Sequence, residues 1–220
     1  MIEAPKPGFA VDIDNVVAKA EPEVQRLYQE ISGKPWPRGL YGSAGGLDHG
    51  GLDREVVEEL FVRFHEYSIP HLPVLPGAKM ALAVLHERYR IVMITARRPT
   101  SRPQTLAWLE KHGIPFDELY HAEEKTGIPE NIIMAVDDHP VHLYGYVNSG
   151  IRTFIMDQPW NRHLSHPSMQ RVLGWDHLLS VLHVSSSVQW PTSLQKSSSP
   201  QRLLRAMGKH DEIPPAAVGA

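Results

Sequence analysis

The chain has 220 residues, of which 42% are hydrophobic and 21% are charged, a composition typical of a globular protein and not of a disordered or collagen-like one. A net charge of -3 provides no broad basic field for a phosphate backbone, so we expect no stable nucleic-acid complex. Because Cys is absent, disulfides, thiolate catalysis and Cys-ligated zinc are excluded.

Short apolar runs alternate along the chain with longer segments of helical period, which is typical of a parallel sheet joined by crossover helices. The predicted strands are residues 8–14, 89–96, 117–122, 131–138 and 151–157. Residues 101–113 and 139–150 each end in Gly, a residue common just past a helix, and are predicted helices. The predicted fold class is therefore α/β.

One gap interrupts this alternation, because about 80 residues separate the ends of the first two strands, far more than one crossover helix needs. Residues 21–33 and 53–68 carry apolar side chains at helical spacing and flank a loop rich in Gly and Pro. We therefore predict a small helical insertion over residues 17–73, with residues 1–16 and 74–183 forming the core.

Polar side chains follow the predicted strands where ligands bind in open α/β sheets, outside the carboxyl ends of the strands. These residues are Asp12, Asp14, Thr95, Asp137 and Asp138, with Lys125 in the loop after the third strand. Each one alone is as well explained by a turn, a strand or a solvated surface. Together, carboxylates from neighbouring strands need a cation, and oxygen ligands with room for water suit Mg²⁺. Thr95 and Lys125 would then bind the phosphate of a substrate.

The order of these residues, DxD, then Thr, Lys and DD, resembles the haloacid dehalogenase (HAD) superfamily of phosphohydrolases. More narrowly, the segments FAVDIDNVVA, ITARRP, HAEEKTG, AVDDHP and QPWNR resemble the 5'(3')-deoxyribonucleotidase, or cytosolic type C 5'-nucleotidase, family. The resemblance implies a Rossmann-like parallel sheet with a small helical cap after the first strand. The periodicity of the sequence placed an insertion at the same position.

The resemblance also implies catalytic roles. Asp12 is expected to be the nucleophile that forms a transient aspartyl phosphate, and Asp14 is expected to be the general acid–base. Mg²⁺ is expected on the Asp12 carboxylate, the Asp14 backbone carbonyl and one of Asp137 and Asp138, with the choice between these two left open. Asn15 stands where many relatives have Gly, and Asn readily adopts the left-handed conformation.

The phosphate oxygens are expected to bind Thr95, the backbone of Ala96 and Lys125, as the resemblance implies. Lys125 is also expected to reduce the negative charge on Asp12. Arg97 and Arg98 follow directly and are candidates for binding a substrate phosphate or base, although the start of a surface helix would explain them as well.

The cap is expected to select the substrate, because loops that close over a rigid site contact the leaving group. Trp36 and Tyr41 are candidates for stacking on a nucleobase. Trp160 and Asn161, which follow the fifth strand, are further candidates for substrate contacts. The pairs His139–His142 and His163–His166 raise a zinc hypothesis that the absence of a HExxH motif disfavours.

We expect an Mg²⁺-dependent phosphomonoesterase, a 5'-nucleotidase for (deoxy)ribonucleoside monophosphates. The alternatives are a phosphatase for another small ester, a polynucleotide-end phosphatase, or a phospho-receiver or other phosphate-binding module without catalysis. A receiver carries its phosphoacceptor Asp on a middle strand and has no insertion after the first strand. A scaffold that uses the tail at residues 184–220 is a further alternative.

That tail is rich in Ser and Pro and is predicted to be disordered. The first residues contain no basic leader followed by an apolar run, and no segment approaches the roughly 18 apolar residues that span a bilayer. We therefore expect a cytoplasmic protein that does not contact membranes. A small phosphorylated molecule is its expected partner, and a homodimer is compatible with the sequence.

Overall fold

The computed structural model describes residues 5–37, 52–125 and 131–184, which belong to one compact unit. Within it, parallel strands form a sheet in the order β3-β2-β1-β4-β5-β6. The strands are β1 (Gly8–Val11), β2 (Arg90–Thr95), β3 (Glu118–His121), β4 (Ile132–Asp137), β5 (Arg152–Met156) and β6 (Met169–Val172). The sheet confirms the predicted α/β class and all five predicted strands. The short, half-exposed edge strand β6 was missed because it has no continuous apolar run.

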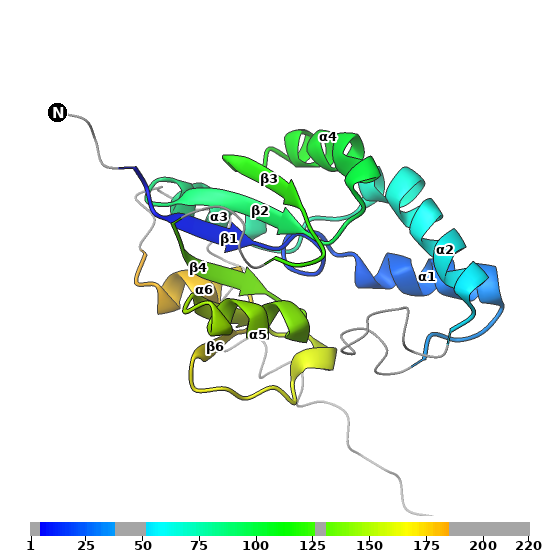
Figure 1. The fold of residues 1–220 in the computed structure, drawn as a ribbon. Helices are drawn as coiled ribbons and strands as arrows, with labels where there is room; N and C mark the ends of the chain where they lie inside the picture. Colours follow the sequence, from blue (N-terminus) through cyan, green and yellow to red (C-terminus); the bar gives the residue numbers. More distant parts are fainter. Residues whose placement is uncertain (1–4, 38–51, 126–130, 185–220) are drawn as a thin grey trace, which may run out of the picture. The chain divides into compact units, whose positions relative to one another are not determined.

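Helices cover both faces of the sheet because its strands are apolar on both sides. Phe9 and Val11 of β1 point into one buried cluster, and Ala10 between them points into another. The helices are α3 (Ala78–His86), α4 (Arg102–His112), α5 (Pro140–Asn148) and α6 (Trp175–Val181), with one-turn helices η4 (Pro99–Ser101) and η5 (Pro159–Asn161). Helices α3, α4 and α6 pack into the cluster of Phe9, and Tyr146 of α5 packs into that of Ala10. Figure 1 shows α5 in front of the sheet and α3 and α6 behind it.

The segment predicted as an insertion is helical where the structure describes it. It contains α1 (Glu21–Ser32), α2 (Arg54–Arg63), the π-helix η2 (Phe64–Ser68) and the 3₁₀ helix η3 (Ile69–His71). The Asp53 carboxylate caps α2 by accepting the Glu55 N–H at 2.9 Å. Both predicted helices are confirmed, although the end of the second is a π-helix. The loop at residues 38–51 lies outside the described residues.

The chain leaves the sheet and returns to it at neighbouring points. Leu75 N–H donates to the Val17 carbonyl at 2.7 Å, and Lys19 N–H donates to the Pro73 carbonyl at 2.8 Å. The proposed ends of the insertion, residues 17 and 73, fall at these contacts, although the domain division stays a prediction. Figure 1 shows the arrowheads of β1, β2 and β4 pointing toward α1 and α2, so the carboxyl ends of the strands face the insertion.

The structure bears only in part on the expected disordered tail and on the expected lack of membrane contact. The predicted disordered tail lies outside the described residues, apart from its first residue. None of the helices in the described ranges has the length and apolar character that a membrane crossing needs.

Candidate active site

Lys125 joins the carboxylates that follow two neighbouring strands. Its Nζ donates to Asp12 Oδ1 at 2.5 Å and to Asp137 Oδ2 at 2.8 Å, and all three side chains are almost fully buried. Asp12 directly follows β1, and its N–H donates to the Val136 carbonyl of β4 at 3.1 Å. Parallel pairing of β1 and β4 therefore brings these carboxylates to the same edge of the sheet.

Asp138 adds a third carboxylate to this group. Oxygen atoms of Asp12, Asp137 and Asp138 lie within 4.8 Å of one another. Burial, opposed by Lys125 and reinforced by the charge of Asp137, raises the pKa of Asp12 to about 7. Burial and the charges of Asp12 and Asp137 also raise the pKa of Asp138 well above its ordinary value.

Asp137 has a lower pKa than usual, because Lys125 and neighbouring donors outweigh the opposing effect of burial. One ammonium group thus faces three buried carboxylates, which leaves excess negative charge in a site shielded from water. Clustered carboxylate oxygens are the ligands that a hard divalent cation prefers. This set of donors fits Mg²⁺. The candidate ligand group found among the described residues contains these three Asp residues and no His.

Asp14 lies beside this group and is held by Arg97. Arg97 Nε donates to Asp14 Oδ2 at 2.8 Å, and its Nη2 donates to Asp14 Oδ1 at 2.7 Å. The Arg97 side chain is only 1% exposed, and its Nη1 donates to Thr105 Oγ1 of α4 at 3.1 Å. The structure therefore directs this guanidinium at the Asp14 carboxylate, and the expected contact with substrate stays a prediction. Arg98 instead pairs with Glu58 of α2 at 2.8 Å.

The residues expected to bind phosphate lie at the carboxyl end of β2. Thr95 is 1% exposed, and its Oγ1 accepts the backbone N–H of Arg97 at 3.2 Å. Its hydroxyl hydrogen therefore points away from that contact and is available to an acceptor. The following residue, Ala96, is exposed, and the expected contact of its backbone with phosphate stays a prediction.

Asn15 adopts the left-handed conformation that its type allows, with φ at 62°. Its Oδ1 accepts the N–H of Glu21 at 2.8 Å, and its carbonyl accepts Gln158 Nε2 at 2.8 Å. The turn after Asp14 is thus tied both to the start of α1 and to the loop after β5. The expectation that Asn15 can adopt the conformation of this turn is confirmed.

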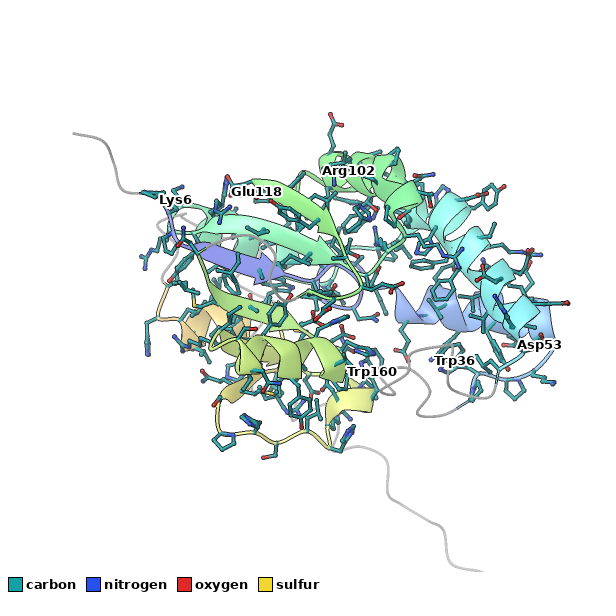
Figure 2. All side chains as sticks on the ribbon, viewed as in Figure 1. Lys6, Trp36, Asp53, Arg102, Glu118 and Trp160 are labelled. Carbon is teal, nitrogen blue, oxygen red and sulfur yellow. The ribbon has the colours of Figure 1, made fainter. Side chains whose placement is uncertain are left out.

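The candidate aromatic contacts have different surroundings. Trp36 packs edge-on against Tyr28 of α1, with ring centroids 5.3 Å apart, and Tyr41 lies outside the described residues. Trp160 Nε1 donates to Asp138 Oδ2 at 3.1 Å, and Asn161 Nδ2 donates to the Asp138 carbonyl at 2.9 Å. Figure 2 shows Trp160 on the core near the start of α5 and Trp36 on the insertion. Trp160 therefore holds the Asp138 carboxylate, and Asn161 holds the backbone of the same residue.

Sequence reasoning did not single out two histidines near Arg97. His121 pairs in register with Thr95, and its Nδ1 contacts the Arg97 carbonyl at 3.1 Å. Its position at the end of β3 obeys the same strand-end rule and was a usable signal. His65 comes from η2 in the insertion, and no motif marks it in the sequence.

Residues 9–187 match the model of a family described as "5' nucleotidase, deoxy (Pyrimidine), cytosolic type C protein". The chain belongs to this nucleotidase family. As a member of the cytosolic type C family, it is a phosphoric monoester hydrolase on a HAD-like fold, as the resemblance implied. The carboxylates, Thr95 and Lys125 at the strand ends accordingly lie where this fold places its ligands.

Known proteins resemble this chain over most of its length, in sequence or in fold. A Chlorobaculum tepidum protein named "Putative 5'(3')-deoxyribonucleotidase" is 25% identical over 184 residues, 79% of this chain and 89% of that protein. A HAD-like hydrolase from Streptococcus pneumoniae superposes with a TM-score of 0.62 at 14% identity, over 80% of this chain and 98% of that chain. The "putative HAD-hydrolase YfnB" of Bacillus subtilis, solved bound to magnesium, superposes with a TM-score of 0.55 at 13% identity. The match covers 82% of this chain and 100% of that chain.

Proposed function

We propose that this nucleotidase hydrolyses (deoxy)ribonucleoside monophosphates with Mg²⁺, through an aspartyl phosphate on Asp12. The observation that carries the proposal is the buried contact of Lys125 with Asp12 and Asp137, next to the Asp14 carboxylate. A buried carboxylate paired with one ammonium group can act as a nucleophile, and a second, less buried carboxylate can move protons.

In the first step, an oxygen of Asp12 attacks phosphorus and the bond from phosphorus to the ester oxygen breaks. Asp14 gives its proton to the departing oxygen, so the alcohol leaves neutral and Asp14 becomes a carboxylate. The ammonium group of Lys125 and the hydroxyl of Thr95 hold the oxygens of the transferring group. The remaining phosphate oxygen binds the backbone that follows Thr95.

In the second step, water attacks the phosphorus of the aspartyl phosphate. Asp14 takes a proton from that water, the acyl phosphate bond breaks, and Asp12 returns as a carboxylate with release of inorganic phosphate. One carboxyl thus acts first as an acid and then as a base, and the enzyme ends in its starting state.

Asp138 is our proposed direct metal ligand beside Asp12 and the Asp14 carbonyl. Both carboxylate oxygens of Asp137 already accept hydrogen bonds, from Lys125 at 2.8 Å and from the His139 N–H at 2.9 Å. Asp138 instead accepts the Trp160 N–H through Oδ2 at 3.1 Å, a contact that fixes the direction of its other oxygen. When bound, Mg²⁺ supplies positive charge against the carboxylates and the transferring phosphoryl group.

The proposal is tested by phosphate release from ribo- and deoxyribonucleoside monophosphates, sugar phosphates and an aryl phosphate, with Mg²⁺ and with a chelator. We expect nucleotides to be turned over with the highest kcat/KM and turnover to stop in the chelator. Preference for a sugar phosphate would keep the phosphatase and replace the substrate class. Turnover that persists in the chelator would contradict the role of the metal, and phosphorylation without turnover would favour a phospho-receiver.

We propose Arg97 as a positioning residue for Asp14, and Arg97→Lys tests this role. Lys keeps the positive charge but loses the two parallel hydrogen bonds that together fix the plane of the Asp14 carboxylate. Charge-assisted hydrogen bonds are worth about 1.5–3 kcal/mol, so kcat is expected to fall by about 10- to 100-fold with little change in KM. The matched control is Arg162→Lys, because Arg162 pairs with Asp157 at the surface. A rise in KM at constant kcat would instead place Arg97 on the substrate.

A further inference from the structure

The segment η2 is an unusual element of the insertion. π-Helices account for well under 1% of residues and occur mostly as single turns, frequently at functional sites. Here Ile69 N–H reaches back to the Phe64 carbonyl, five residues earlier. The wider turn buries two consecutive side chains, Phe64 and His65.

His65 is a buried imidazole with an unused polar atom. Its ring stacks on Phe61 at 5.7 Å and meets the edge of Phe64 at 5.5 Å, which fixes its orientation. The residue is 6% exposed, and its Nδ1 finds no hydrogen-bond partner within the described residues. Burial lowers the pKa of His65 to about 4, so the ring is neutral at pH 7. A buried polar atom of this kind is costly unless something pairs with it.

A stripe along α2 and η2 connects His65 to the loop after β2. Glu58, Phe61 and His65 share one helix face, three and four residues apart. Arg98 donates to Glu58 Oε2 at 2.8 Å, and its guanidinium lies 5.0 Å from the centre of the Phe61 ring. This face of the insertion therefore rests on the segment that directly follows Thr95 and Arg97.

The charged groups that act on the His65 ring belong to the candidate active site and to the loop after β2. The negative charge of Asp14 raises the pKa of His65, whereas Arg97, Arg98 and His121 lower it. Asp14 is the residue we propose to protonate the leaving oxygen. The stacking of His65 on Phe61 under Arg98 puts the ring on the side of the insertion that meets the loop carrying Arg97, the partner of Asp14. In the proposed mechanism the phosphate oxygens are already bound by Lys125 and Thr95, so His65 is not needed to bind them.

We propose that His65 is a substrate-positioning residue of the insertion, whose Nδ1 hydrogen-bonds a hydroxyl of the alcohol part of the phosphate ester. The chemical class it selects is a monoester of a polyhydroxylated alcohol, such as the sugar of a nucleotide. This inference rests on the proposed function and adds the residue that recognises the leaving group. The neutral ring supplies one donor and one acceptor, which suits an uncharged hydroxyl better than a phosphate.

The test compares His65→Phe and His65→Asn with the native enzyme on a nucleoside monophosphate and on an aryl phosphate, which has no sugar hydroxyl. Phe keeps an aromatic ring on Phe61 but removes Nδ1, and the Asn amide restores a polar group near that position. We expect the ratio of kcat/KM for the nucleotide to kcat/KM for the aryl phosphate to fall about tenfold or more in His65→Phe. His65→Asn should recover most of that ratio. The matched control is His71→Phe at the exposed His71 of η3, and this variant should have the same ratio as the native enzyme.

An unchanged ratio in His65→Phe, with both activities intact or both reduced equally, would overturn the inference and leave His65 a structural residue. If the native enzyme hydrolysed none of the nucleotides, the proposed substrate class would instead be rejected. In that case the same ratio, measured with the best sugar phosphate of the panel, decides the role of His65.

Discussion

Replacing Asp12 with Asn is expected to reduce phosphate release by at least about 1,000-fold while the protein stays folded. The amide has nearly the same shape as the carboxyl but is a poor nucleophile, so no aspartyl phosphate forms. The variant also removes one of three clustered, buried carboxylates, the one whose pKa is raised to about 7 by burial and by the negative charge of Asp137. We therefore expect an unfolding temperature, measured without metal, at or above that of the native protein.

Asp53→Asn is the matched control, because Asn caps a helix as well as Asp does and this residue lies at the start of α2. It should keep activity within about twofold, the margin expected for a neutral surface change. Acid quenching of the native enzyme during turnover should give a peptide that contains Asp12 and carries one phosphoryl group. Residual activity of several per cent in Asp12→Asn, or a phosphoryl group elsewhere, would reject Asp12 as the nucleophile.

Replacing Lys125 with Met is expected to cost both activity and stability. Lys125 is the ammonium group that pairs with the buried Asp12 and Asp137, so its loss leaves buried charge without compensation. Removing one partner of a buried ion pair costs about 3–5 kcal/mol of unfolding free energy. Phosphate release should fall by about 100-fold or more, because the phosphate also loses a cation. Urea denaturation in metal-free buffer measures the stability. The exposed Lys34 provides the control Lys34→Met, which should lie within about 0.5 kcal/mol of the native value.

The stability loss in Lys125→Met should depend on pH. Burial raises the folded-state pKa of Asp12 from 3.8 to about 7, so the folded state binds a proton that the unfolded chain has released. Such a group lowers stability as the pH rises from about 4 to 7, and Lys125 opposes this effect by lowering the pKa of Asp12. The variant should therefore be closest to native at pH 4–5 and furthest from it above pH 7. A pH-independent deficit would contradict this electrostatic origin.

The positions of Asp12, Thr95 and Asp137 followed from local sequence because each comes at the end of an apolar strand. Parallel strands end at one edge of a sheet, so naming the strands places their last residues in one region. The fold class was predictable for the same reason. The edge strand β6 was not, because it carries no hydrophobic run and exists through pairing with β5.

The contacts made by long side chains were not predictable. Arg97 was a candidate for contact with a substrate phosphate or base, and that contact stays a prediction; Thr105 of α4 sets the direction of its guanidinium, which lies on Asp14. Trp160 and Asn161 were candidates for substrate contacts, and both hold Asp138. In each case the sequence neighbourhood allowed several directions, and packing against a distant segment selected one.

The sequence by itself determined the α/β class, the positions of the first five strands along the chain and the helices between the first two strands, and it pointed to the acidic, Thr and Lys residues at and after the strand ends as the candidate site. These depend on periodicity and on residues adjacent in the chain, which local physics links to strands, helices and turns. Only the tertiary structure decided that one lysine pairs with two carboxylates, that Arg97 holds Asp14 and that His65 stacks on Phe61 beside Arg98. Those contacts join segments far apart in the chain, and their geometry is fixed by packing and burial, which no short stretch of sequence encodes.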